Sequence, residues 1–227
     1  MTSRYNIFYQ VHKGLRALLY ETSLCLQQTD FREAGDADQV LDQVYMATNL
    51  FTTHAQTEEQ YIMTAIRNYS SLLYDECEKE YAGNVSLTAH MHGLIQAYYH
   101  AVTGDEKQEI GSVIISSFRN FTIFNLELMG RKENSLNKAL WKNYTDEELM
   151  DITLQISKDL SPETSAQYSK WILRGVSNGE VIEWLMGIKQ TAPDRIFNAL
   201  LEMAENEIRT ERWNKIQESL AEGAMLA

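Results

Sequence analysis

Proline is almost missing from this chain, and that constrains the possible folds more than any other feature of the sequence. The 227 residues contain only two prolines, Pro162 and Pro193. Inside a helix, proline removes a backbone donor and clashes with the preceding turn, so a proline-free stretch leaves room for long unbroken helices. We therefore expect long helices up to about residue 160 and shorter elements after it.

Apolar residues recur at helical spacing in four long segments of that region. Asp36, with Gln39 three residues later, is the expected N-cap of the second segment. Four long helices joined by short connections are typical of an antiparallel up-and-down bundle. The expected fold class is therefore all-α, with a four-helix bundle in residues 1–144 and no sheet. The segments cover residues 3–29, 36–67, 73–104 and 114–141.

Shorter helical patterns follow the fourth segment, and several begin with a recognisable cap. Thr145 with Glu148, and Ser177 with Glu180, have the spacing of capping boxes. We therefore expect residues 145–227 to form a C-terminal extension of short helices packed on the bundle, which gives at least eight helices in the whole chain.

The charge and the apolar content of the chain exclude two classes of partner. With 32 acidic and 20 basic residues the net charge is −12, so a nucleic-acid backbone would be repelled. No window reaches the roughly 18 uninterrupted apolar residues that a membrane span requires. Two cysteines and no apolar secretory leader favour a reducing compartment. We expect a cytoplasmic protein that binds neither nucleic acid nor a membrane.

Four side chains of metal-ligand type occupy the expected core faces of three helices. His12 lies on the apolar face of the first helix and Glu133 on that of the fourth. His54 and Glu58 are four residues apart, so they share one face of the second helix. Burying a carboxylate is unfavourable unless it is paired or bound to a cation. Two histidines and two carboxylates on facing helices therefore indicate a metal site inside the bundle.

These segments resemble the bacterial hemerythrin-like cation-binding proteins over roughly residues 5–145. The resemblance is carried by YNIFYQVHKGLRALL in the first helix, LFTTHAQTEEQYIMTAI in the second and FTIFNLELMGRKENSLNKALW in the fourth. The tail from YTDEELMDI onward, with SKWILRGVSNGEVIEWL, resembles the C-terminal extension of some members. The resemblance implies a hemerythrin-like four-helix bundle followed by helical additions.

The same resemblance implies an incomplete di-iron site. Family members hold two irons with five histidines and two bridging carboxylates. His12 and His54 match two terminal histidines of one iron, while Glu58 and Glu133 match the bridging carboxylates. A di-iron site is not expected, and the four residues would hold one iron, manganese or zinc ion. The three histidines of the second iron are replaced by Tyr81, Val85 and Leu128.

The replacing residues are expected to fill the core where the second iron is lost, although the phenol of Tyr81 is an additional candidate ligand. The charged run from Glu127 to Lys132 is interpreted as a solvated face, with Arg131 and Lys132 exposed. No other motif of the chain adds a ligand to this set.

Three classes of function remain open at this point. The first is a module that binds one metal ion or responds to oxygen or nitric oxide. The second is a metal-free bundle, serving as a scaffold or small-ligand binder, whose buried carboxylates are protonated or hydrogen-bonded beside a charged His12 or His54. The third, an enzyme with a single ferrous site, ranks last, because the chain has no phosphate-binding glycine loop, nucleophile elbow or CxxC motif.

Overall fold

Every regular element in the described part of the chain is a helix. The computed structural model describes residues 4–67 and 69–225, and no strand occurs among them. This confirms the all-α fold class. The chain separates into two compact units, the first comprising residues up to Tyr9 with Leu18–Leu160, and the second comprising Gln10–Ala17 with the residues from Ser161 onward.

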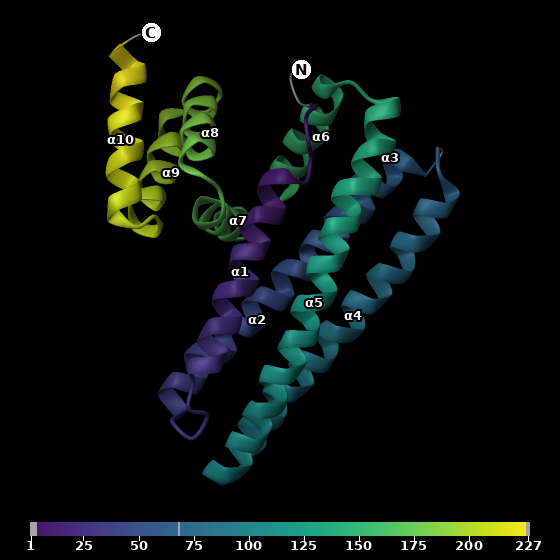
Figure 1. The fold of residues 1–227 in the computed structure, drawn as a ribbon, viewed down its shortest axis with the longest axis vertical. Helices are drawn as coiled ribbons and strands as arrows, with labels where there is room; N and C mark the ends of the chain where they lie inside the picture. Colours follow the sequence, from purple (N-terminus) through teal and green to yellow (C-terminus); the bar gives the residue numbers. More distant parts are fainter. Residues whose placement is uncertain (1–3, 68, 226–227) are drawn as a thin grey trace. The chain divides into compact units, whose positions relative to one another are not determined.

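Long helices dominate the first unit, as the scarcity of proline predicts (Figure 1). Helix α2 continues without interruption through a π-helical turn, η1 (Glu58–Met63), into the short α3 (Thr64–Ile66). Helices α2, α4 and α5 run side by side, and α4 contacts both of the others. The long helices are α1 (Tyr9–Gln28), α2 (Ala34–Thr57), α4 (Ser71–His100) and α5 (Gly104–Asn143).

The first two helices begin at residues other than those predicted from the sequence. The first helix was expected from Ser3, which lies outside the described residues, but it begins at Tyr9. Before it, Asn6 forms a turn, in which its Oδ1 accepts from the Phe8 N–H at 3.0 Å. The second helix begins at Ala34, so Asp36 is not its N-cap and lies in the first turn instead. A carboxylate there still interacts favourably with the N-terminal end of the helix dipole.

Capping side chains explain where several helices begin. Helix α5 starts ten residues earlier than expected, because Thr103 and Glu106 form a capping box that the sequence analysis missed. The predicted box of Thr145 with Glu148 is confirmed at the start of α6 (Asp146–Asp159). The predicted box at Ser177 is confirmed in the same way at the start of α8 (Asn178–Thr191).

Aromatic side chains fill one part of the first unit's core. The Tyr98 hydroxyl donates to the Phe31 carbonyl at 3.0 Å, and the rings of Phe51 and Phe121 meet edge to face at 5.4 Å. Gly111 allows α5 to approach this cluster, since a Cβ there would lie 2.2 Å from Phe31 Cγ. This part of the core is held by packing of apolar groups.

The second unit combines residues 10–17 of α1 with four short helices. Helix α1 and α7 approach each other closely at two glycines, because a Cβ on Gly14 would lie 2.8 Å from the Ile172 nitrogen and one on Gly175 would lie 2.4 Å from the Lys13 oxygen. The helices are α7 (Pro162–Gly175), α8, α9 (Asp194–Glu207) and α10 (Thr210–Met225). Their core consists of Leu173, Val176, Val181, Leu185, Leu200, Ala204, Ile208, Trp213 and Ile216.

The sequence placed the start of the C-terminal extension at residue 145, at the junction of α5 and α6. The compact units divide later, after Leu160. Helix α6 belongs with the first unit because its Leu149 is buried in a cluster with Ile7 and Leu140. The C-terminal unit therefore begins with α7, at the Ser161 N-cap.

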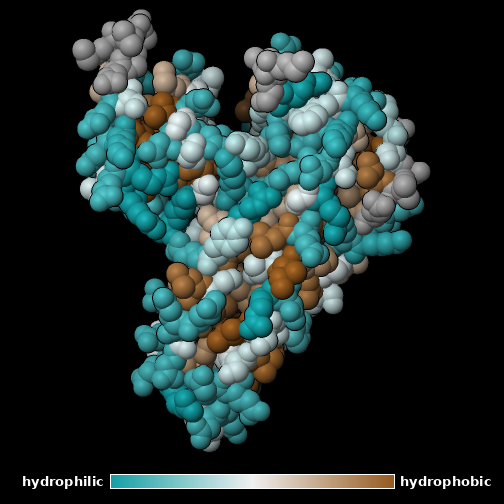
Figure 2. Space-filling view, in the orientation of Figure 1, coloured by the Kyte–Doolittle hydropathy of each residue, from teal (hydrophilic) through white to brown (hydrophobic). Residues whose placement is uncertain are grey.

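The surface of the molecule is mixed in polarity. Figure 2 shows hydrophobic residues reaching the surface between hydrophilic ones. Tyr20, Leu24, Tyr45 and Ile123 are about half exposed. Within the residues described, no helix combines the length and the apolar character that crossing a membrane would require.

Candidate metal centre

The π-turn brings a histidine and a carboxylate together inside the first unit. His54 lies in the last turn of α2, and Glu58 is the first residue of η1. His54 Nε2 and Glu58 Oε1 are 3.2 Å apart, and both residues are buried. Two ligand atoms bound to one ion at about 2.1 Å lie roughly 3 Å apart. The pair therefore has the spacing of two neighbouring ligands of one metal ion.

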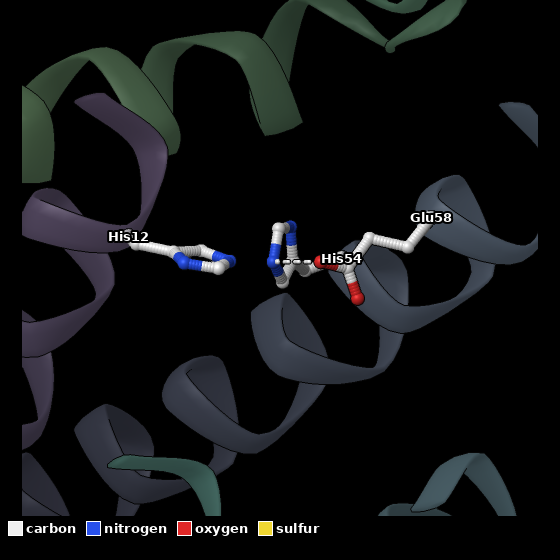
Figure 3. A group of neighbouring side chains, drawn as sticks. All are labelled: His12, His54 and Glu58. Carbon is white, nitrogen blue, oxygen red and sulfur yellow. Dashed lines mark ion pairs between the residues drawn. The ribbon is translucent and has the colours of Figure 1, made fainter. Parts of the chain in front are cut away.

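His12 of α1 joins this pair. One ligand atom from each of His12, His54 and Glu58 lies within 4.8 Å of the other two, and all three residues are buried. Figure 3 shows the His12 ring directed toward the His54 ring, with the Glu58 carboxylate beside the latter. Helix α1 is unbroken from Tyr9 to Gln28. Residues 18–28 of this helix belong to the first unit, so the helix that carries His12 is also part of that unit.

Glu133, the fourth predicted ligand, is not part of this group. It is half-buried on α5, and its backbone carbonyl accepts a hydrogen bond from Asn137 Nδ2 at 3.1 Å. The structure thus brings together three of the four predicted ligands, with two imidazoles and one carboxylate among them.

Lys132, the residue before Glu133, reaches Glu58 instead. Its Nζ donates to Glu58 Oε2, and its side chain is only 11% exposed. The prediction that Lys132 lies on a solvated face is therefore wrong. Leu128 and Leu136 stand one turn before and after it, and both are buried, so Lys132 shares their face of α5. This spacing was the signal in the sequence that could have identified it.

The three residues that replace the lost histidines have different surroundings. Leu128 is buried and fills the core as predicted. Val85 is 43% exposed, so its predicted place in the core is wrong. Asn84 and Thr88 occupy the buried face of that part of α4. Tyr81 is half-buried and lines a cavity that it shares with Glu58.

That cavity lies beside the π-turn, between η1 and α4. It has a volume of about 30 Å³, which is enough for one or two water molecules. Three of its lining residues are glutamates, so the approach to Glu58 is favourable for a cation. The lining residues are Ala55, Glu58, Glu59, Met63, Tyr74, Cys77, Glu78 and Tyr81.

A contact with α6 fixes the outer side of the π-turn. The Tyr61 hydroxyl donates to the Asp159 carboxylate, which also accepts from Gln155 Nε2 at 3.1 Å. The hydrogen bond to Asp159 raises the pKa of Tyr61, and the same bond lowers the pKa of Asp159. Because Tyr61 lies three residues after Glu58, this contact helps to hold the turn that positions the carboxylate.

The histidines of α4 have other partners. His92 Nε2 lies 2.9 Å from Thr48 Oγ1, and burial lowers the pKa of this imidazole. His90 Nε2 lies 3.1 Å from Ser117 Oγ, and His100 bonds to a backbone carbonyl of its own helix. The group of His12, His54 and Glu58 is therefore the one metal-ligand cluster found in the part of the chain that the structure describes.

The donor set itself indicates what the centre can do. Two imidazoles and one carboxylate suit ferrous iron, manganese or zinc, and three protein ligands leave positions open for water or a small ligand.

Comparisons with models of protein families, with curated proteins and with solved structures found no match. The geometry of these side chains is therefore the basis on which a function can be proposed.

Proposed function

We propose that this chain is a hemerythrin-like helical protein that binds one divalent transition-metal ion through His12, His54 and Glu58. The observation that carries the proposal is the convergence of these three buried ligand side chains from α1 and from the end of α2. Two histidines with one carboxylate and open positions form the ligand set of mononuclear ferrous sites. Ferrous iron is therefore the first candidate, followed by manganese and zinc.

The proposed role is binding or sensing of a small ligand. A bound ion supplies Lewis acidity and open coordination positions, and the protein supplies the orientation of the ligands. The neighbouring cavity of about 30 Å³ admits a molecule the size of water, oxygen or nitric oxide. A small diatomic or water-sized ligand is therefore the first candidate.

The ion pair of Glu58 with Lys132 supports a second candidate function, a metal-free helical scaffold. The ammonium of Lys132 already neutralises the buried carboxylate. In this alternative the histidines and Glu58 form a closed polar network, and the cavity binds water or another small neutral molecule.

Metal analysis separates the two functions. Protein purified without added metal would be analysed for its metal content, stripped with a chelator, and titrated with Fe²⁺ under anaerobic conditions and with Mn²⁺ or Zn²⁺. We expect one ion per chain. His54→Gln should weaken binding by at least about a hundredfold, since even the loss of a residue that only orients a ligand costs roughly ten- to a hundredfold.

His90→Gln is the matched control, because His90 is an exposed histidine outside the group. Its metal affinity should equal that of the parent. A parent chain that binds none of the three ions at micromolar concentration would favour the metal-free scaffold. Equal affinities of the His54 and His90 variants would contradict the proposed ligand set.

A further inference from the structure

The Glu58 carboxylate has a nitrogen-bearing side chain beside each of its two oxygens, an imidazole and an ammonium. Oε1 lies 3.2 Å from His54 Nε2, on the side of the metal-ligand group, and Oε2 accepts from Lys132 Nζ. The two oxygens therefore have different partners from different helices. Oε1 is the oxygen that lies next to a histidine of the metal-ligand group.

We propose that Lys132 is a built-in cation which occupies the second oxygen of Glu58, limits the centre to one metal ion and sets its affinity for that ion. This inference rests on the metal site proposed above. It assigns to Lys132 a positioning and charge-regulating role, without direct contact between the ammonium and the metal.

Because Lys132 is buried, its charge acts strongly on neighbouring charged groups. The side chain of Lys132 is 11% exposed and that of Glu58 is 4% exposed, so solvent screens the pair poorly. In the metal-free chain the ammonium and the carboxylate neutralise each other. When a divalent ion is added, the site carries the charge of both cations, and their repulsion opposes metal binding.

The position of Lys132 also excludes a second ion. A carboxylate commonly bridges two metal ions with one oxygen bound to each of them. Because Lys132 Nζ donates to Oε2, a second metal ion would have to displace a buried ammonium from its partner. This contact therefore favours a stoichiometry of one ion per chain.

The test compares Lys132→Gln with Lys138→Gln, which removes an exposed lysine of the same helix. Zn²⁺ binding to the chelator-stripped chains would be measured by competition with a chelating dye. We expect Lys132→Gln to bind Zn²⁺ at least about tenfold more tightly than the parent, because the repelling charge is gone. The Lys138 variant should bind like the parent.

The outcomes separate this inference from the metal site itself. A parent that binds one Zn²⁺ together with a Lys132→Gln variant of equal or weaker affinity would overturn the inference and leave the site intact. Zn²⁺ binding by neither chain would overturn both proposals. Binding by Lys132→Gln alone would support the inference, while the proposed function would fail for the natural chain.

A second measurement uses the parent chain, so it does not depend on how the variant folds. Lysine side chains would be acetylated in solution with and without saturating Zn²⁺, and the modified sites would be read by mass spectrometry. We expect Lys132 to remain protected in both states, because it keeps its contact with Oε2, while Lys138 reacts in both. Zn²⁺-dependent exposure of Lys132 would overturn the inference.

Discussion

The two compact units of this chain treat charge in opposite ways. The first unit buries Glu58 and covers Lys132 almost completely, whereas the buried residues that the structure describes in α7–α10 are all hydrophobic. The ion pairs described for the second unit, such as Lys13 with Glu180, involve side chains that are 16–36% exposed. The buried residues described for α7–α10 are thus packed without a charged side chain among them. The buried charge of the first unit is therefore better explained by binding than by stability.

Breaking the buried ion pair should produce the largest effect on stability. Lys132→Met leaves the Glu58 carboxylate buried without its ammonium partner, and Glu58→Gln leaves the ammonium without its carboxylate. Each change should lower the free energy of unfolding of the metal-free chain by about 4 kcal/mol. Urea unfolding followed by circular dichroism measures this.

The matched experiment removes both buried charges from the first unit, so that its core becomes apolar at these positions, like that of the second unit. A double variant, Glu58→Leu with Lys132→Met, replaces the pair by apolar side chains and should unfold within about 1 kcal/mol of the parent or above it. A double variant as unstable as the single variants would show that the ion pair itself is needed for the fold.

Closing the space between α1 and α7 should produce the next largest effect. Gly175→Ala places a Cβ 2.4 Å from the backbone oxygen of Lys13, which cannot move without shifting the helix. We expect a loss of about 3 kcal/mol, measured by thermal unfolding. Gly179→Ala is the control, since nothing lies within 4 Å of its Cβ. Equal melting temperatures for the two variants would contradict the close approach.

Acid should weaken the second unit through Glu180. Burial opposes ionisation of this carboxyl, but hydrogen bonds from Lys13 and Ser177 outweigh it and lower the pKa of Glu180 to about 2, from an ordinary value of 4.5. A lowered pKa in the folded state stabilises the protein above pH 4.5, and this contribution disappears as the pH falls toward 2. We expect a loss of about 2 kcal/mol over that interval.

The measurement is the unfolding free energy of the parent and of Glu180→Gln at several pH values between 6 and 2. The difference between the two chains should shrink as the pH falls. A difference that stays constant over this range would rule out Glu180 as the source of the pH dependence.

Helix caps should have the smallest effects, and these should be equal in the two units. Thr103 caps α5 in the first unit and Ser161 caps α7 in the second, each accepting a backbone N–H at 3.2 Å. Replacing either by alanine should lower stability by about 1 kcal/mol. Ser135→Ala, at an exposed position within α5, serves as the control. A large difference between the two caps would mean that they also act through tertiary contacts.

The sequence predicted the parts of this molecule that depend on local signals. Helical spacing located the long helices, and the caps at Thr145 and Ser177 were read from residues three apart. The four-residue spacing of His54 and Glu58 also predicted that both lie on the buried face of their helix, and both residues are buried. The sequence thus predicted the three residues of the metal-ligand group together with Glu133, which is not part of it.

The errors concern the rotation of a helix about its own axis. Lys132 faces inward and Val85 outward, although the opposite was predicted for each. Adjacent residues of a helix differ by about 100° in direction, so a boundary position can be assigned to the wrong face when the packing partner is unknown. Which of Lys132 and Glu133 reaches Glu58 depends on how α5 packs, and apolar spacing alone does not specify that.

The π-turn at Glu58–Met63 makes the number of residues in this helix important for its function. A π-turn closes its hydrogen bonds over five residues and an α-turn over four, so the segment accommodates one residue more than a regular helix. Deleting one residue between Glu59 and Met63 would allow a continuous α-helix. The residues after the deletion would still point to the same side of the helix, but Glu58 would no longer lie in a π-turn. A related chain that has abandoned this centre should therefore show a single-residue gap here when the two sequences are aligned, with the apolar pattern on either side unchanged.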